Sequence, residues 1–153
     1  MSYVQGTLSK DEEIKEVAKL HWFNYVKVVL WSLFAIFFLL AYLSDPDMQN
    51  DPSLLYVTII LLIWPAYLFL KLRKTEMVIT NKRVICREGI ISVKTEELKN
   101  AKIESVEIRQ SVLGRLFGYA TIYFSGTGTS KVKFESVQDP WVIKSRAESI
   151  IGD

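Results

Sequence analysis

The stretch that decides the fold begins at residue 28, where the chain reads VVLWSLFAIFFLLAYL up to residue 43. A second run, LLYVTIILLIWPAYLFL, occupies residues 54–70, and neither run contains a charged side chain. A helix rises about 1.5 Å per residue, so roughly 17 to 20 residues cover most of a bilayer's hydrocarbon core. The two runs predict a hairpin of membrane-spanning helices at about 25–43 and 54–70, joined by a loop at 44–53.

Two alternative readings of these runs fit their composition poorly. A soluble helix of about five turns normally needs a polar face, and neither run has one. A cleaved signal peptide is disfavoured because the first run begins well inside the chain and ends in Ser44-Asp45-Pro46, without a small-residue cleavage site. No ionisable side chain lies within either run, so the sequence offers no ion path at membrane depth. The pattern therefore favours an anchor over a transporter.

The charges around the two runs predict an orientation. The connecting loop carries Asp45, Asp47 and Asp51 but no lysine or arginine, so all 19 basic residues lie elsewhere. Three of them follow the second run at once, at Lys71, Arg73 and Lys74. Because positively charged flanks stay on the cytoplasmic side, the loop is expected outside and both termini in the cytoplasm.

The segment before the hairpin, residues 1–24, shows apolar residues at helical spacing. Ser9 followed by Glu12 matches a capping box, a signature of a helix start. The apolar or weakly polar positions that then recur are Ile14, Val17, Ala18 and His21. Residues 1–27 hold four basic and four acidic side chains, so this segment is not a polybasic anchor. The spacing predicts a cytoplasmic amphipathic helix leading into the first span.

After residue 71 the apolar period changes from helical to two, which is typical of strands. Short stretches rich in Val, Ile, Thr and Phe lie at 75–80, 83–87, 90–98, 103–110, 121–124 and 131–134. Asn81-Lys82, Glu88-Gly89 and Gly126-Thr127-Gly128 are typical of turns between them. Ile103 and Val106 fall on opposite faces, which indicates a bulge or a late strand start.

The end of the chain returns to helical spacing. Asp139 is suited to cap a helix and Pro140 to occupy its first position, while Ile143, Ala147 and Ile150 or Ile151 form an apolar stripe. Consecutive strands followed by one helix predict a bent antiparallel sheet covered by that helix. The segment 71–153 is long enough for one small core.

Composition also narrows the chemistry. The single cysteine, Cys86, cannot close an intramolecular disulfide, and no CxxC pair is present to hold zinc. One histidine, His21, leaves little for a histidine-based metal site or a Ser-His-Asp arrangement. Gly126-Thr127-Gly128 lacks the Lys-Ser/Thr and helix start of a phosphate-binding loop, and neighbouring Glu96 and Glu97 point to opposite faces of a strand. We expect no catalytic constellation, no metal, no cofactor and no nucleic-acid partner.

Several segments together are similar to one family. They are TEMVITNKRVI at 75–85, GII at 89–91, IESVEIRQSVLGRLFG at 103–118, and the stretch 8–22 with its acidic pair and terminal His21-Trp22. In these segments the chain resembles the membrane-anchored bacterial PH-domain family, over nearly its whole length. The most specific element is the long spacing from Thr80-Asn-Lys-Arg83 to Gln110-Ser111 and Gly114-Arg115.

The resemblance implies an α+β membrane protein in which a two-helix hairpin precedes a pleckstrin-homology-like domain. That domain would be an antiparallel sandwich or partly open barrel, with two nearly orthogonal sheets of about seven strands and a C-terminal helix as cap. It also implies a multi-pass protein of the bacterial inner membrane. The expected organisation is an N-terminal helix in 1–24, a hairpin in 25–70 and a cytoplasmic PH-like domain in 71–153.

Residues 71–153 carry 15 basic and 10 acidic side chains, a net charge of +5 beneath the bilayer. The candidate lipid- or partner-binding residues are Lys71, Arg73, Lys74, Arg115, Lys131 and Lys133. The candidate loop motif is Gln110, Ser111, Gly114 and Gly118. Arg115 is suited to a phosphate or a neighbouring subunit because its guanidinium is a planar fork. The alternatives are that the first three basic residues only set topology, that Lys131 and Lys133 form a solvated face, and that the loop is held by local hydrogen bonds.

The leading hypothesis is a non-enzymatic adaptor or scaffold, tethered by the hairpin, that binds protein segments or anionic lipid and self-associates. Expected partners are membrane lipids, further copies of the chain and another membrane or cytoplasmic protein. The alternative is a subunit of an oligomeric pore or lipid-handling assembly, which needs a polar stripe facing a lumen. The two runs offer only Ser32 and Thr58 for such a stripe. A membrane enzyme would need a buried acid-base pair that the pattern does not provide.

Overall fold

The computed structural model describes residues 3–152, which fall into two compact units. One unit, the sheet unit, combines the N-terminal segment up to His21 with the chain from Lys74 onward. The other, the helix unit, spans Trp22–Arg73. The N-terminal segment therefore belongs to the β-rich part of the protein. The predicted boundaries, which set residues 1–24 apart as a separate element before the hairpin, differ from this division.

The helix unit contains the two predicted spans. It consists of α2 (Phe23–Ser44), the short α3 (Pro46–Gln49) and most of α4 (Pro52–Lys74). Both long helices have the length and apolar composition of candidate membrane spans. Pro65 lies inside α4 without ending it. Most large apolar side chains on α2 and α4 are exposed, as expected of helices whose apolar surface faces something other than the chain itself.

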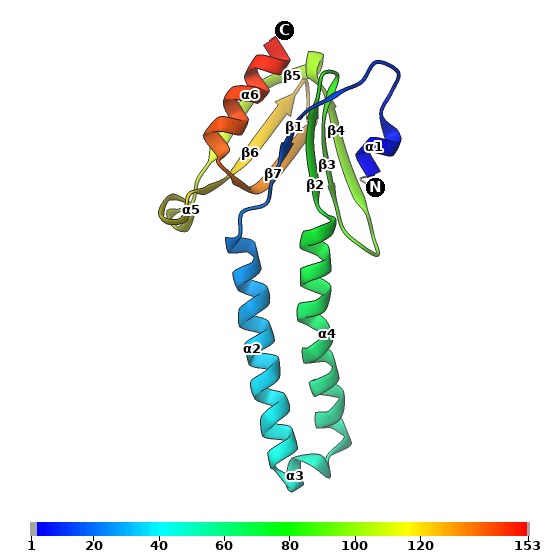
Figure 1. The fold of residues 1–153 in the computed structure, drawn as a ribbon, viewed down its shortest axis with the longest axis vertical. Helices are drawn as coiled ribbons and strands as arrows, with labels where there is room; N and C mark the ends of the chain where they lie inside the picture. Colours follow the sequence, from blue (N-terminus) through cyan, green and yellow to red (C-terminus); the bar gives the residue numbers. More distant parts are fainter. Residues whose placement is uncertain (1–2, 153) are drawn as a thin grey trace. The chain divides into compact units, whose positions relative to one another are not determined.

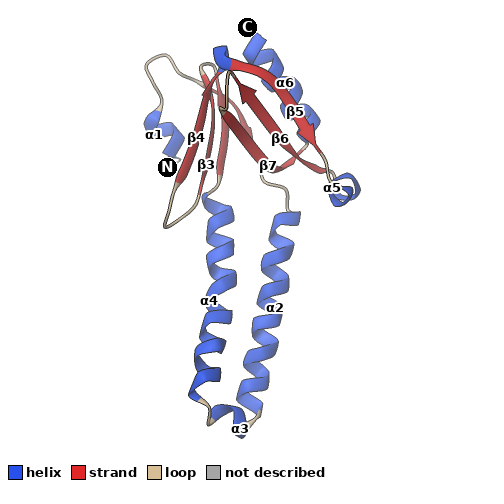
Figure 2. Cartoon of the chain, turned by 180° about the vertical axis from the view of Figure 1, so that it is seen from behind, coloured by secondary structure: helices blue, strands red, loops and turns tan. Residues whose placement is uncertain are grey.

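The sheet unit contains two antiparallel sheets (Figures 1 and 2). The first has the order β1-β2-β3-β4, with β1 Ile14–Ala18, β2 Glu76–Thr80, β3 Arg83–Glu88 and β4 Lys94–Lys99. The second has the order β5-β6-β7, with β5 Ile103–Arg109, β6 Tyr119–Gly126 and β7 Lys131–Gln138. Helices α1 (Tyr3–Thr7), α5 (Val112–Phe117) and α6 (Pro140–Gly152) and the 3-10 turn η1 (Asn100–Lys102) complete it. This mixed α/β arrangement is consistent with a PH-like fold.

The predicted amphipathic helix before the hairpin is wrong. Residues 14–18 form β1, which pairs antiparallel with β2 from Ile14↔Thr80 to Ala18↔Met77. Val17, which a helical stripe would bury, is 49% exposed. A bulge between Ile14 and Glu16 lets Ile14 and Ala18 pack on opposite faces of the sheet, whereas a helix would place them on one face, and the backbone groups of β2 are satisfied by pairing with this strand. The long-range partner therefore overrides the local spacing.

Strand β1 completes the sheet unit. The chain after the hairpin supplies six strands, and the seventh comes from before the hairpin. Because β1 and β2 are hydrogen-bonded neighbours, the whole helix unit is inserted into the connection between two adjacent strands. The chain leaves the first sheet after Ala18 and re-enters it at Glu76.

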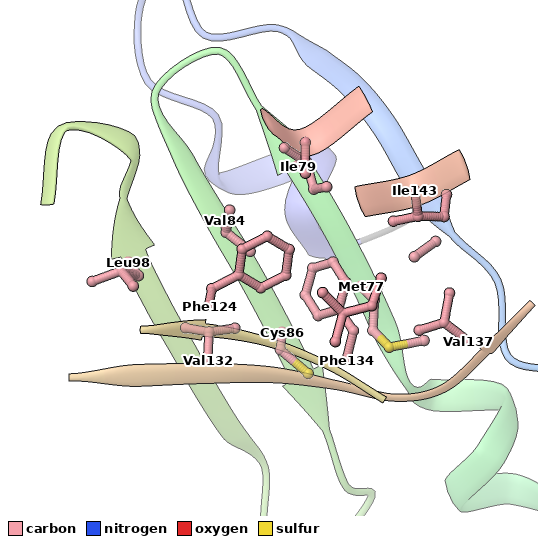
Figure 3. Close-up of a cluster of buried hydrophobic side chains, with 13 residues drawn as sticks. Met77, Ile79, Val84, Cys86, Leu98, Phe124, Val132, Phe134, Val137 and Ile143 are labelled. Atoms are coloured by element: carbon pink, nitrogen blue, oxygen red, sulfur yellow. The ribbon is translucent and has the colours of Figure 1, made fainter. Parts of the chain in front are cut away.

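The main core lies between the two sheets and α6. Figure 3 shows side chains from β2, β3, β4, β6, β7 and α6 pointing into one interior. Phe124 and Phe134 meet edge to face at its centre, with ring centroids 5.0 Å apart. Ile143 and Ala147 are buried on α6, with Ile150 and Ile151 packed at the margin, which confirms the predicted stripe. Helix α6 begins at Pro140, its predicted first position, and the Asp139 backbone carbonyl accepts from the Val142 and Ile143 N–H groups.

A second, smaller core lies on the other face of the first sheet. Val4 of α1 is fully buried against Val78 and Ile85, with Leu8 and Ile14 packed around them. This cover explains why β2 and β3 read as continuous apolar runs and do not alternate, since both of their faces are buried.

The remaining strand predictions hold with shifted ends. The turn at Asn81-Lys82 and the irregular register between Ile103 and Ser105 are present. Strands β6 and β7 are longer than predicted, while β4 begins at Lys94 and not at residue 90. The delay follows from Gly89, whose φ of +105° starts a turn in which a Cβ would lie 2.0 Å from the Ser92 carbonyl oxygen.

These contacts predict that residues 74–153 do not fold alone. Without the N-terminal segment, β2 loses its strand partner and the side chains of Val78 and Ile85 lose their cover. A chain in which residues 22–73 are replaced by a flexible loop of about eight residues, so that His21 joins Lys74, should instead fold cooperatively. Circular dichroism and amide exchange on both chains test this. Equal protection and equal unfolding midpoints in the two chains would contradict it.

Candidate functional site

The motif Thr80-Asn-Lys-Arg83 lies at the turn between β2 and β3, where it binds the N-terminal segment. The Arg83 Nε donates to Glu12 Oε1 at 2.9 Å, and one terminal nitrogen, Nη2, donates to Glu12 Oε2 at 3.1 Å and to the Thr7 carbonyl at 2.9 Å. The other terminal nitrogen, Nη1, donates to Glu97 at 2.7 Å. The guanidinium therefore joins three separate segments of the sheet unit.

The neighbouring residues of the motif add to this attachment. The Thr80 hydroxyl donates to Glu12 Oε1 at 2.8 Å, and the Asn81 side chain accepts from the Glu13 backbone N–H at 2.9 Å. The Lys82 ammonium donates to the Lys10 carbonyl at 2.5 Å. We conclude that this motif is structural. Arg83 is a salt-bridged strand residue whose guanidinium nitrogens donate to Glu12, Glu97 and the Thr7 carbonyl.

Glu12 is the buried partner of this network. Its side chain is almost fully enclosed. Burial alone would raise its pKa, but hydrogen bonds from the Ser9 backbone N–H, Arg83 and Thr80 outweigh burial and lower the pKa from 4.5 to about 2. Of the predicted capping box, one bond is present, since the Ser9 N–H donates to Glu12 Oε2 at 2.8 Å. The Glu12 N–H donates to the Ser9 carbonyl, and the two residues close a turn and not a helix.

The loop motif between β5 and β6 forms the short helix α5. Ser111 caps this helix, because its Oγ accepts from the Gly114 N–H at 3.0 Å. The Gln110 side chain donates to the carbonyls of Gly114 at 3.1 Å and Tyr119 at 3.3 Å. Gly118 ends the helix with a φ of +82° in the left-handed region. These four residues therefore hold a defined local structure, as the structural alternative for this loop predicted.

The structure held by this scaffold is an exposed apolar helix. Val112 is 87% exposed, Leu116 75% and Leu113 52%, whereas Phe117 is 37% exposed. The Arg115 side chain is exposed and has no hydrogen bond or ion pair with the described residues 3–152. The sequence-based candidates in this loop are its polar residues and glycines, and the apolar residues are not among them. Val112-Leu113 and Leu116-Phe117 could have been noticed, because they lie between two predicted strands and belong to the alternating pattern of neither.

Among the six basic candidates, the three on β7 and α5 do not form one patch within the sheet unit. Lys131 begins β7, whereas Gln138 at the other end of that strand bonds to the Lys19 carbonyl near the exit toward α2. Lys133 pairs with Glu135 at 2.5 Å, and this contact raises the pKa of its ammonium and offsets its charge. Arg115 lies on α5. The other three candidates follow the second apolar run, where Arg73 stacks over the Phe69 ring at 5.0 Å to the centroid.

The candidate reactive side chains are held in structural roles. Burial, together with the carboxylates of Glu88, Glu96 and Glu135, raises the pKa of the Cys86 thiol to about 12, so the nucleophilic thiolate is not formed near neutral pH. His21 is buried with its ring 5.4 Å from that of Tyr119. Within residues 3–152, no three His, Cys, Asp or Glu side chains are grouped as a metal site would require.

The hydroxyls of Ser32 and Thr58 form hydrogen bonds within their own helices. Ser32 donates to the Val28 carbonyl and Thr58 to the Leu54 carbonyl, each at 2.8 Å. Each donor is therefore already used within one helix turn. These contacts give no support to a polar stripe of the kind that a pore would need.

The fold and this arrangement define a class: a two-sheet, PH-like unit whose first two strands are joined through a pair of long apolar helices. Comparison with protein families gives a match to the bacterial PH domain over residues 21–151, which is most of the chain. The protein therefore belongs to the bacterial PH domain family, as its motifs indicated. Neither the comparison with curated proteins nor that with solved structures found a match.

The ion pair predicts a defined response to mutation and pH. Glu12→Gln leaves Arg83 without its buried partner and should lower the free energy of unfolding by about 3 kcal/mol. Because the folded pKa of Glu12 is depressed, its contribution is fully present above pH 4.5 and is lost as the pH falls toward 2. The difference in unfolding midpoint between wild type and Glu12→Gln should shrink over that range. Glu13→Gln, at an exposed neighbour, is the matched control, and a pH-independent difference would contradict the assignment.

The α5 scaffold predicts a site-specific glycine requirement. A Cβ at Gly114 would lie 2.5 Å from the Tyr119 carbonyl oxygen, so Gly114→Ala should destabilise the sheet unit by about 1–3 kcal/mol. Gly6→Ala is the control, since a Cβ there meets nothing within 4 Å. Thermal unfolding of both variants tests the difference. Equal midpoints would show that α5 tolerates displacement.

Proposed function

We propose that this protein is a non-enzymatic, membrane-tethered adaptor or scaffold of the bacterial inner membrane. In this proposal α2 and α4 cross the membrane, the loop at 44–53 faces outward, and both termini lie in the cytoplasm. The PH-like sheet unit then binds partner protein segments or anionic lipid at the cytoplasmic face. The tether confines the unit to the membrane surface and so raises its effective concentration there.

One observation carries the proposal: the two apolar helices are inserted between adjacent strands of a single sheet. A domain on a terminal tether is joined at one point, whereas this unit is joined at two, after His21 and before Lys74. Two joints limit rotation of the unit about its tether more than one joint does. An adaptor needs this restriction if it is to present a constant face to its partners.

The charge pattern supports the orientation. Lys71, Arg73 and Lys74 follow the second apolar run, and a basic residue beside an anionic leaflet gains ~1 kcal/mol. The outward loop is acidic. A non-enzymatic role is supported by the buried Cys86 thiol, with its raised pKa, and by the structural use of Glu12 and Arg83.

Self-association is part of the proposal. Large apolar side chains remain exposed along both α2 and α4, for example Phe37 at 71% and Ile60 at 63%. Ser32, Ala35 and Ala66 line a groove between these helices, and small residues allow close approach of a further helix. Light scattering on detergent-solubilised protein measures the subunit number, and a strict monomer at all concentrations would remove this part.

Topology is tested with single cysteines in a Cys86→Ala background. In intact cells from which the outer layers are removed, a membrane-impermeant maleimide should label Asn50→Cys in the loop but not Thr129→Cys in the sheet unit. Permeabilised cells should label both. Extraction at alkaline pH should leave the full chain in the membrane pellet. The reverse labelling pattern, or release of the protein by alkali, would overturn the proposal.

A further inference from the structure

Two exposed apolar segments of the sheet unit have no role in its core. We call them the two apolar tips. The first is the loop 89–93 between β3 and β4, where Ile91 is 89% exposed and Val93 44%. The second is α5, with Val112, Leu113, Leu116 and Phe117. Water-exposed Ile and Leu side chains at these levels cost free energy unless a partner covers them.

Both tips lie at the end of the sheet unit where its two chain connections are made. Tyr119, directly after α5 and Gly118, stacks beside His21, and α2 begins two residues after His21. Arg87, two residues before the first tip, pairs with Glu76, the first residue of β2 after α4. Figure 2 shows the β3–β4 loop and α5 at this same end of the two sheets.

The tips are held in place by local structure. The Gly89 turn closes against the Ser92 backbone, and α5 is fixed by Gln110, Ser111 and Gly118. The β6–β7 turn lies at the opposite end, because the Thr127 N–H donates to the Lys102 carbonyl beyond the far end of β4. The apolar exposure at the first end is therefore a feature of defined structure.

We infer that the two apolar tips insert into the interface of the membrane that α2 and α4 cross, with Arg115 binding a lipid phosphate. This inference rests on the proposed function, because it needs the membrane tether. A bilayer surface is the occupant because both tips lie at the end of the sheet unit from which the chain continues into α2 and α4, the helices that cross the membrane in the proposed function. An exposed arginine among apolar side chains matches the boundary between acyl chains and headgroups. The tips thus set which face of the sheet unit remains open to the cytoplasm.

The test uses the full chain, in a Cys86→Ala background, reconstituted into vesicles. Single cysteines at Leu116, Ile91 and Thr129 carry an environment-sensitive fluorophore, and lipids with a shallow spin label act as quencher. A fourth cysteine, Leu40→Cys on α2, reports insertion of the hairpin itself. Labels at 116 and 91 should be blue-shifted and quenched, whereas the label at 129, on the opposite end of the unit, should behave as in water.

The possible outcomes distinguish failure of tip insertion from failure of the membrane tether. Quenching at 40 with water-like labels at 116 and 91 overturns the inference and leaves the tether intact. No quenching at 40 overturns the tether and the inference together. If the labels at 116 and 91 are shielded only at high protein-to-lipid ratio, a second copy is the occupant and lipid insertion is overturned.

Arg115 is tested in vesicles of phosphatidylcholine and in an equal mixture with phosphatidylglycerol. Arg115→Gln should lower the ratio of inserted to free tip about fivefold in the anionic vesicles, the equivalent of ~1 kcal/mol per basic residue. Arg109→Gln is the matched control, since Arg109 is already engaged by Glu107 and the Tyr123 ring. Equal effects of the two substitutions, or the same effect in neutral vesicles, would overturn the role of Arg115.

Discussion

The buried carboxylate of Glu12 is the constraint on which the rest of the sheet unit depends. It lies 71 positions from Arg83 in the chain, and its enclosure is tolerable only because the guanidinium, the Thr80 hydroxyl and the Ser9 N–H satisfy it. The same N-terminal segment pairs β1 with β2 and places Val4 on the outer face of the first sheet. The segments before and after the hairpin thereby become one folded unit.

This closure has a mechanical consequence. Because β1 and β2 are neighbouring strands, the helix unit between them is joined to the sheet unit at both of its ends. The end of the sheet unit at which both joints lie also carries both apolar tips. Membership of the bacterial PH domain family fixes the architecture, while the proposed role in the membrane follows from where the helices are inserted.

In the loop between β5 and β6, the polar residues and glycines have a different structural role from the apolar residues. Gln110, Ser111, Gly114 and Gly118 are used entirely in shaping α5, by capping, a side-chain bridge and a left-handed end. Arg115 and the apolar residues Val112, Leu113 and Leu116 between them are exposed. Residue type alone suggested the reverse, because polar side chains in a loop are the usual candidates for binding, and exposure is not visible in a sequence.

The sequence by itself determined the two apolar helices, the six strands after the hairpin and the C-terminal helix, because each has the length and residue composition typical of its element. It could not determine β1, because the spacing of Ile14, Val17 and Ala18 is helical, and the bulge and partner strand that override it are not visible in the sequence. Nor could it show that Lys133 is paired with Glu135, or that Glu12 meets Arg83. Tertiary structure decided these points. A short segment takes the conformation in which its backbone groups pair with a distant strand and its buried charge meets an opposite charge, as β1 does with β2 and Glu12 with Arg83.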